Sequence, residues 1–300
     1  MVLDSRPHRY LGLNLSGAKN QKTSVAALEY YPNQKKVFLL DIHDRVPQAP
    51  DQTSDQALLE LLDELKAPQP GKTLLTFDTA LSLPPCVTCE KKCPMPEKCV
   101  VPSVKWMRVL SKKMRKSHFL RDEGVRVLEF TPYTQRPVEL WLRYEVLPEL
   151  PEPYRFEVDE ALGGSRGPLV ARLNFLQKHL KNFDHCEAHP KLSTSILAYE
   201  FGASKRLITA YRRLEEGAQA RQELIEIFAD RLGLFVYDRD LRKLSLSLAS
   251  FDAFVCAVTG WLSDTGRTVQ KPAGFPSEWI QYPDPDASAW DGGLMGESPR

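Results

Sequence analysis

The chain has 300 residues, of which 42% are hydrophobic and 26% charged, as expected for a globular protein with one large core or two modest ones. Lysine and arginine number 40 against 39 aspartate and glutamate residues, and the formal net charge is +1. This balance excludes a uniformly basic nucleic-acid coat protein and an acidic tail protein. Any charged partner is therefore expected to meet a local patch.

The N-terminal segment and the most apolar late segment predict neither export nor membrane insertion. Arg6, His8 and Arg9 interrupt the apolar residues near the N-terminus, so a signal peptide is not expected. The apolar stretch 253–262 is too short to span a bilayer and predicts a buried helix. We expect a cytoplasmic protein that does not bind membranes, and the sequence gives no indication of its oligomeric state.

The first part of the chain has the pattern of three strands, a helix and a fourth strand. The three strands are predicted to form a meander and cover residues 10–15, 23–31 and 36–42. Residues 57–65 carry apolar side chains at helical spacing, and residues 73–77 form an apolar run typical of a buried strand. This strand ends at Asp78.

The second part of the chain is mostly helical. The predicted helices cover residues 137–147, 168–181, a long region 195–232 broken near Gly202 and Gly217, and 246–262. Short strands are predicted at 183–188 and, as an edge strand, at 125–130. An α/β protein with a mixed sheet flanked by helices is expected, and the order of its elements resembles the ribonuclease-H-like fold.

The composition also divides the chain into segments. Residues 1–80 and 125–283 are predicted to form the two parts of the core, and 81–124 an inserted segment rich in proline, cysteine and basic residues. The last segment, 284–300, is predicted to be a disordered tail.

Three acidic residues lie where an α/β sheet would bring them to one edge. Asp78 ends an apolar strand, Glu187 ends a short predicted strand, and Asp252 lies in an otherwise apolar helix. Grouped carboxylates can hold divalent ions that hydrolyse phosphodiester bonds. Each acid taken alone is equally compatible with a helix cap or a salt bridge.

Seven short motifs occur in a fixed order along the chain, namely GLNLSGAK, TFDTALSLPPC, RPVELWLR, EAHPKLS, AYRRLEEGAQARQELI, FDAFVCAVTGWL and PSEWIQYP. Their order resembles the bacterial and archaeal family called domain of unknown function 429, whose members are predicted to be ribonuclease-H-like nucleases. The resemblance covers about two thirds of the chain and leaves residues 81–124 outside. The family's motif acids correspond here to Asn14, Asp78, Glu187 and Asp252. The chain therefore has Asn14 at a family aspartate, and it has Ala249 where the family often has a further acid.

This resemblance implies a metal-dependent nuclease. Asp78, Glu187 and Asp252, assisted by Asn14, would hold one or two Mg²⁺ or Mn²⁺ ions that activate water. An asparagine oxygen can ligate a metal, but it carries no negative charge and cannot act as a base. The alternative is a catalytically degenerate module that binds nucleic acid or regulates another protein.

A nucleotide-dependent phosphotransferase is a third alternative. Ser16, Gly17 and Lys19 lie between the first two predicted strands, where a phosphate-binding hairpin occurs in kinases of related fold. The glycine-rich loop 162–167 precedes a predicted helix and is a second candidate for anion binding. Both loops are equally typical of ordinary turns.

Four of the six cysteines are concentrated in the predicted insertion, at Cys86, Cys89, Cys93 and Cys99. This density predicts a closed tetrahedral zinc site, and an iron–sulfur cluster is the alternative metal centre. Unligated or redox-active thiols are the alternative without a metal. A bound metal would stabilise a loop that is too small to have a core of its own.

A basic run follows the cysteines and is predicted to contact nucleic acid. Its candidate binding residues are Lys105, Trp106, Arg108, Lys112, Lys113, Arg115 and Lys116. The cations would hold phosphates and the tryptophan would stack on a base. A solvated basic helix face is the alternative.

Two further groups of residues carry weaker patterns. His185 and His189 bracket Glu187 at alternate positions, which allows a His/Glu metal site but is more typical of ordinary strand-end histidines. Arg136 and Arg143, with Glu139, match the family's arginine and acid pattern in part, and surface pairs explain them equally well.

Overall fold

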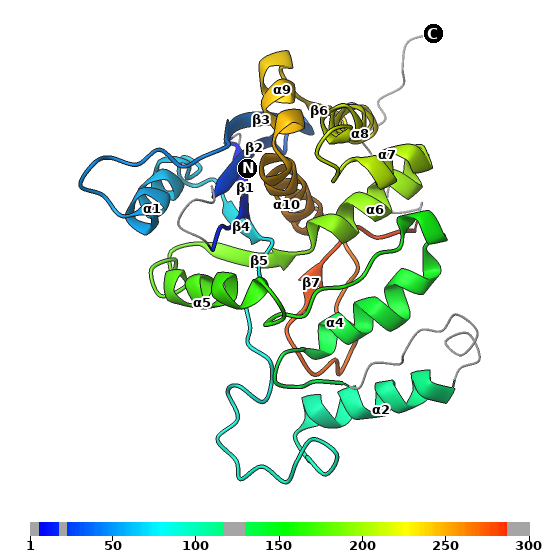
Figure 1. The fold of residues 1–300 in the computed structure, drawn as a ribbon. Coiled ribbons are helices and arrows are strands. Elements are labelled where there is room, and N and C mark those ends of the chain that lie inside the picture. The colour runs from blue at the N-terminus through cyan, green and yellow to red at the C-terminus, as the bar shows by residue number, and fades with distance from the viewer. Residues whose placement is uncertain (1–5, 18–22, 117–129, 287–300) are drawn as a thin grey trace.

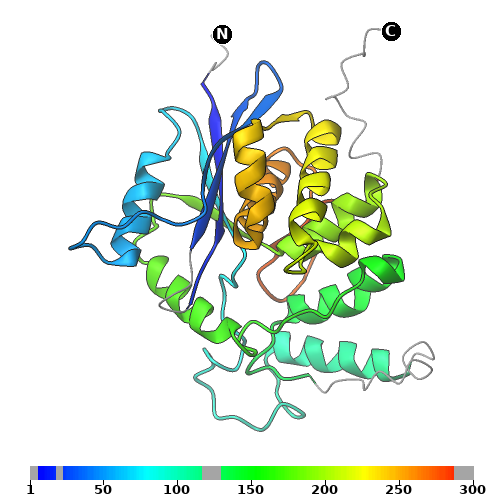
Figure 2. The ribbon, with the colours of Figure 1, turned by 45° about the horizontal axis from the view of Figure 1, so that its top comes forward.

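A seven-stranded mixed sheet forms the centre of the protein, with helices packed on both faces (Figures 1 and 2). The computed structural model describes residues 6–17, 23–116 and 130–286. The strands lie in the order β6-β3-β2-β1-β4-β5-β7. The predicted α/β class, with a mixed sheet flanked by helices, is confirmed.

The first three strands form the predicted antiparallel meander. The strands are β1 (His8–Asn14), β2 (Ser24–Tyr31), β3 (Lys36–His43), β4 (Thr73–Phe77), β5 (Asp184–Ala188), β6 (Leu234–Phe235) and β7 (Ile280–Gln281). β4 runs parallel to β1, and β5 runs parallel to β4. β7 and β6 add parallel edges at opposite sides of the sheet.

Most of the described helices lie in the second half of the chain. They are α1 (Ser54–Glu64), α2 (Pro102–Lys116), α4 (Pro137–Trp141), α5 (Arg166–Leu176), α6 (Pro190–Glu200), α7 (Lys205–Ala210), α8 (Gly217–Leu232), α9 (Asp238–Leu246) and α10 (Leu248–Asp264). A π-helical turn (Leu142–Val146) and 3₁₀ turns (Leu147–Glu149 and Glu152–Tyr154) follow α4.

Two hydrophobic cores lie on the two faces of the sheet. On one face, Leu58 and Leu62 of α1 and Leu173 of α5 pack with alternate residues of β1 and β4. On the other face, α6, α8 and α10 pack against the sheet and supply a large part of the core. Within the described residues no single helix is long and apolar enough to cross a membrane; α9 and α10 together pass that test but are bent by 116°.

A glycine sets the distance between α10 and the sheet. A Cβ atom added to Gly12 of β1 would lie 2.0 Å from the carbonyl oxygen of Ala253, a distance that no carbon atom can keep. The helix backbone therefore approaches β1 closely only because residue 12 has no side chain. This approach brings Asp252 to the carboxyl ends of the central strands.

The segment predicted as an insertion packs on α4. Residues 81–101 contain no helix or strand, and α2 follows them. Met107 and Leu110 of α2 share a small core with Leu140 and Tyr144. Of the other sequence predictions, nearly all of the edge strand at 125–130 and most of the tail 284–300 lie outside the described residues.

Candidate functional site

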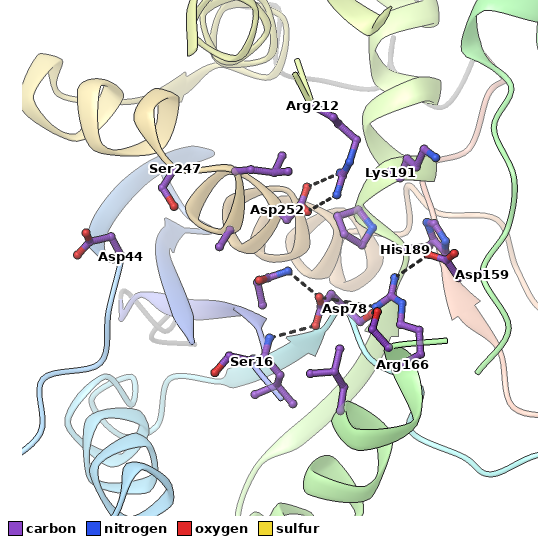
Figure 3. Close-up of a pocket in the computed structure, with 17 residues that line it drawn as sticks. Ser16, Asp44, Asp78, Asp159, Arg166, His189, Lys191, Arg212, Ser247 and Asp252 are labelled. Atoms are coloured by element: carbon purple, nitrogen blue, oxygen red, sulfur yellow. Dashed lines mark hydrogen bonds and ion pairs between the residues drawn. The ribbon is translucent and has the colours of Figure 1, made fainter. Parts of the chain in front are cut away.

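A pocket of about 730 Å³ opens beyond the carboxyl ends of β1 and β4 (Figure 3). Asn14 is the last residue of β1, Asp78 follows β4, and Asp252 lies in the second turn of α10. All three line the pocket. Because β1 and β4 are parallel neighbours, their carboxyl ends meet at the same edge of the sheet.

Asp78 is buried and fully hydrogen-bonded. Its Oδ1 accepts from the backbone N–H of Leu15 at 3.2 Å and from the Thr79 hydroxyl at 2.9 Å. Its Oδ2 accepts from the amide nitrogen of Asn14 at 2.6 Å. Burial raises the pKa of Asp78 to about 6, although Arg166 and the hydrogen bonds from Thr79 and Leu15 oppose the shift. Near neutral pH this carboxyl group is therefore close to its titration range.

Asp252 is buried in α10 and forms a two-point ion pair with Arg212. Nη1 and Nη2 of the guanidinium each lie 3.1 Å from a different carboxylate oxygen. Burial raises the pKa of Asp252 above its usual value, and Arg212 opposes that shift. The Arg212 side chain is 37% exposed, whereas that of Asp252 is 6% exposed. The arginine can therefore move away from the acid, but the acid is fixed.

Glu187 does not join the pocket. Its carboxylate receives two hydrogen bonds from Arg136, at 2.6 and 2.8 Å, and one from the backbone N–H of Leu81 at 2.9 Å. Arg136 also binds Glu139, and all three charged side chains are at most 7% exposed. Glu187 lines only a small adjoining cavity of about 30 Å³, which it shares with Asp78. Its observed contacts are those of a buried ion pair.

Three cations line the same pocket as the acids, namely Arg166, Lys191 and Arg212 (Figure 3). Arg166 donates to the backbone carbonyl of Asp78 at 3.1 Å and lies 3.6 Å from the Asp159 carboxylate. The Lys191 ammonium lies 4.5 Å from the centre of the Phe156 ring. The pocket therefore combines carboxylates with a cationic wall.

Three helices begin at the pocket. Its lining includes Arg166, Pro190 and Leu248, which are the first residues of α5, α6 and α10. The free backbone N–H groups and the dipole at a helix N-terminus favour bound anions. Together with the cations, they make this wall of the pocket electropositive.

His189 is the N-cap of α6 and also lines the pocket. Its Nδ1 accepts from the backbone N–H of Leu192 at 3.3 Å, and its ring stacks on Phe156. Burial, with Arg166 and other nearby cations, lowers the pKa of His189 to about 3. The ring is therefore neutral in the physiological range. His185 is exposed and its Nδ1 lies 3.2 Å from the carbonyl oxygen of Phe183, so the two histidines do not converge on Glu187.

The described part of the chain contains no group of three His, Cys, Asp or Glu side chains arranged to hold a metal ion. Asp44 and Asp159 also line the pocket, and the oxygen donors at the strand ends and on α10 are the carboxylates of Asp78 and Asp252 and the side-chain amide of Asn14. This donor set suits one hard divalent ion such as Mg²⁺ or Mn²⁺. The amide of Asn14 must first rotate, because its nitrogen now faces Asp78.

The phosphate-loop candidate is only partly described. Ser16 lines the pocket, and its backbone N–H and hydroxyl both contact the Thr23 hydroxyl. Arg172 donates to the carbonyl oxygen of Ser16 at 2.7 Å. Gly17 follows Ser16 in the chain. Lys19 lies outside the described residues, so the predicted phosphate contact stays a prediction.

The four clustered cysteines lie in the loop between β4 and α2. Cys99 is buried, Cys86 is partly buried, and Cys89 and Cys93 are exposed; none forms a disulfide. The pKa of Cys86 is raised first by burial and then by the other three thiols. Within the described residues, however, the four cysteines do not form a group placed to hold a metal ion. Arg108 of α2 donates to the carbonyl of Cys99 and to two further loop carbonyls.

The basic run forms α2, but several of its side chains have structural partners. Arg108 holds the cysteine loop, and Lys113 pairs with Glu145 at 3.0 Å. Trp106 packs edge-on against Phe275, with ring centres 5.1 Å apart. The exposed candidates that remain are Lys105 and Lys112, while the side chains of Arg115 and Lys116 lie outside the described residues.

Comparison of the chain with protein-family models, with curated proteins and with solved structures finds no match. The resemblance to the domain of unknown function 429 family therefore stays a prediction from the motifs.

The sequence reasoning missed the cations of the pocket. Lys191 lies in the motif EAHPKLS and Arg212 in the motif AYRRLEEGAQARQELI. The motifs were recognised, but neither residue was predicted to line the site. Arg166 lies in the glycine-rich loop that was considered for anion binding. Basic residues close to helix starts were the available signal.

Proposed function

We propose that this chain is a ribonuclease-H-like protein that hydrolyses phosphodiester bonds of nucleic acid at the pocket. The observation that carries the proposal is the meeting of Asn14, Asp78 and Asp252, which come from distant parts of the chain, in one pocket. The topology supports it: an antiparallel meander followed by two parallel strands, with the last long helix packed on the first strand, is expected of that fold.

A divalent ion would be held by the carboxylates of Asp78 and Asp252 and by the amide oxygen of Asn14. We propose one ion rather than two, because Glu187 is committed to Arg136 and Leu81. When bound, such an ion lowers the pKa of a water molecule and neutralises charge on the phosphate.

The chain's own residues prepare this site in two ways. The burial that raises the pKa of Asp78 to about 6 leaves its carboxyl group ionised above that pH and protonated below it. Arg212 is exposed enough to exchange Asp252 for a phosphate oxygen of the substrate. That exchange frees a carboxylate as the substrate arrives, and it also binds the substrate by a charge-assisted pair.

A second candidate is a module that binds nucleic acid without cutting it. The pairing of both carboxylates favours it, since Asn14 donates to Asp78 and Arg212 neutralises Asp252. The phosphotransferase alternative depends on Lys19, which lies outside the described residues, and it stays a prediction.

In the same proposal the four-cysteine loop binds a structural zinc ion, with an iron–sulfur cluster as the alternative. Four free thiols within one loop supply a suitable donor set. The loop would close around the ion, because within the described residues no three such side chains are yet placed as ligands. Zinc would then stabilise the loop that Arg108 attaches to α2.

The test is cleavage of labelled single-stranded and duplex DNA and RNA with Mn²⁺ or Mg²⁺. The wild type is compared with Asp78→Asn and with Asp51→Asn, which changes an exposed acid in a loop. The proposal predicts cleavage by the wild type and the control and its loss in Asp78→Asn. Salt-sensitive binding without cleavage by any protein would favour the binding module instead.

A further inference from the structure

Part of the pocket wall consists of groups that the proposed metal site does not use. They are the guanidinium of Arg166, the ammonium of Lys191 and the ring of His189, and all three residues line the pocket. Each comes from the start of a helix: Arg166 begins α5, and His189 and Lys191 lie at the start of α6. Each of these groups is a hydrogen-bond donor.

Lys191 lies near other cations, and no ion pair joins it to a carboxylate within the described residues. Its pKa is lowered first by burial and then by Arg212. Its ammonium packs over the ring of Phe156, and its nearest acids act on it only at longer range. A half-buried cation in this position is stabilised when an anion enters the pocket.

His189 presents a hydrogen-bond donor that has no acceptor. Its Nδ1 receives the N–H of Leu192, so the ring of the neutral histidine carries its proton on Nε2. This Nε2 is buried and has no hydrogen-bond partner within the described part of the chain. A buried donor without an acceptor is unfavourable, and a ligand oxygen would satisfy it.

Arg166 completes the group from the neighbouring helix. Its contacts to carboxylates are long, at 3.6 Å to Asp159 and 3.9 Å to Asp78. The Asp159 side chain is 66% exposed and is free to turn into solvent. Arg212, in contrast, has a close two-point partner in Asp252. Arg166 Nη1 donates to the backbone carbonyl of Asp78 at 3.1 Å, so Nη2 is the group that can turn to an incoming anion without breaking a close ion pair.

We propose that Arg166, Lys191 and His189, at the starts of α5 and α6, form a binding subsite for the phosphoryl oxygens of a phosphate ester. The identification of that ester as part of a nucleotide rests on the proposed function. Two cations, a neutral N–H donor and two helix N-termini match a phosphate group, which has several oxygens and one or two negative charges. The subsite lies in the same pocket as the acids, so it would hold a phosphate of the substrate during hydrolysis.

The test is calorimetric titration of the full chain in EDTA with inorganic phosphate, with thymidine 5′-monophosphate and with thymidine. We expect both phosphate-bearing probes to bind and thymidine not to bind. Tighter binding of the monophosphate identifies a nucleotide ester as the source, and equal binding identifies free phosphate. Because no divalent ion is present, phosphate binding is measured independently of cleavage, and either proposal can fail alone.

Three variants assign the binding to these residues. Lys191→Gln and His189→Asn are each expected to weaken phosphate binding about 10-fold, the effect of losing one hydrogen bond to a charged ligand. Asparagine is a good N-cap, so His189→Asn keeps α6 while it removes the ring N–H. Lys181→Gln is the control, because Lys181 lines a different pocket at the opposite ends of β4 and β5. The proposal is overturned if the wild type does not bind phosphate, if thymidine binds as tightly as its monophosphate, or if only the control loses affinity.

Discussion

The carboxyl group of Asp78 is expected to destabilise the folded chain at neutral pH, and Asp78→Asn should relieve that cost. Burial raises the pKa of Asp78 from 3.8 to about 6. A carboxyl group whose pKa is raised by folding stabilises the folded state at low pH, where it is protonated. That contribution to the free energy of unfolding is lost as the pH rises through the folded-state pKa. Each unit of pKa corresponds to about 1.4 kcal/mol, so the effect reaches up to about 3 kcal/mol.

The assay is urea unfolding, followed by tryptophan fluorescence, of the wild type, Asp78→Asn and Asp51→Asn at several pH values. As the pH rises from about 4 to about 7, the free energy of unfolding of Asp78→Asn minus that of the wild type should increase by up to about 3 kcal/mol. Other buried acids, such as Asp252 and Glu139, remain in both proteins and largely cancel in the difference. An asparagine side chain can keep the hydrogen bonds from Leu15 and Thr79.

A difference in free energy of unfolding between Asp78→Asn and the wild type that does not change with pH, or that favours the wild type more as the pH rises, would show that folding does not raise the pKa of Asp78. Asp51→Asn should show no such trend, because Asp51 is exposed. A variant that is more stable and yet inactive would also show that loss of cleavage is not caused by unfolding.

Two further perturbations test the buried ion pair and the cysteine loop. Arg136→Met leaves Glu187 and Glu139 buried without their cation. In urea titrations it should lower the free energy of unfolding by about 3 to 5 kcal/mol. The double variant Arg136→Met/Glu187→Gln should recover part of that loss. An undiminished stability of Arg136→Met would contradict the role of the pair. Elemental analysis of freshly purified protein should find one zinc ion per chain, and Cys99→Ser should lose it. A brown protein that contains iron would show that the loop binds an iron–sulfur cluster instead of zinc. A protein without metal would contradict both proposed metal centres.

The sequence predicts the central elements well, because their patterns depend on local physics. The run 73–77 has the apolar character of a strand buried on both faces, and it is β4. Gly202 ends the first helix of the long helical region with a positive φ of 71°, as helix-terminating glycines do. The edge strands β6 and β7 have only two residues each, which is too short for any periodic pattern.

The predicted helix at 137–147 shows where a local pattern is incomplete. Its α-helical part ends at Trp141 and continues as a π turn and then a 3₁₀ turn. Pro148 has no N–H group, so a regular helix cannot continue through it. The apolar spacing predicts the buried face, but it does not determine the type of helical turn.

The partners of the charged residues explain why the site is only partly predictable. Asp78 and Asp252 were found because a charge inside an apolar element requires an explanation. Glu187 was identified by its place at a predicted strand end and by the family motif, yet Arg136, which lies 51 residues earlier, binds that carboxylate. Contacts of such long range depend on the folded topology and leave no periodic signal in the sequence.

Titration with Mn²⁺, followed by the electron paramagnetic resonance of the free ion, measures directly whether Asn14, Asp78 and Asp252 bind a divalent ion. We expect one ion per wild-type chain, no such binding in Asp78→Asn, and tighter binding in Asn14→Asp, where a third carboxylate replaces the amide that now donates to Asp78. If neither the wild type nor Asn14→Asp takes up Mn²⁺, or if Asp78→Asn binds it as well as the wild type, the proposed metal site is wrong.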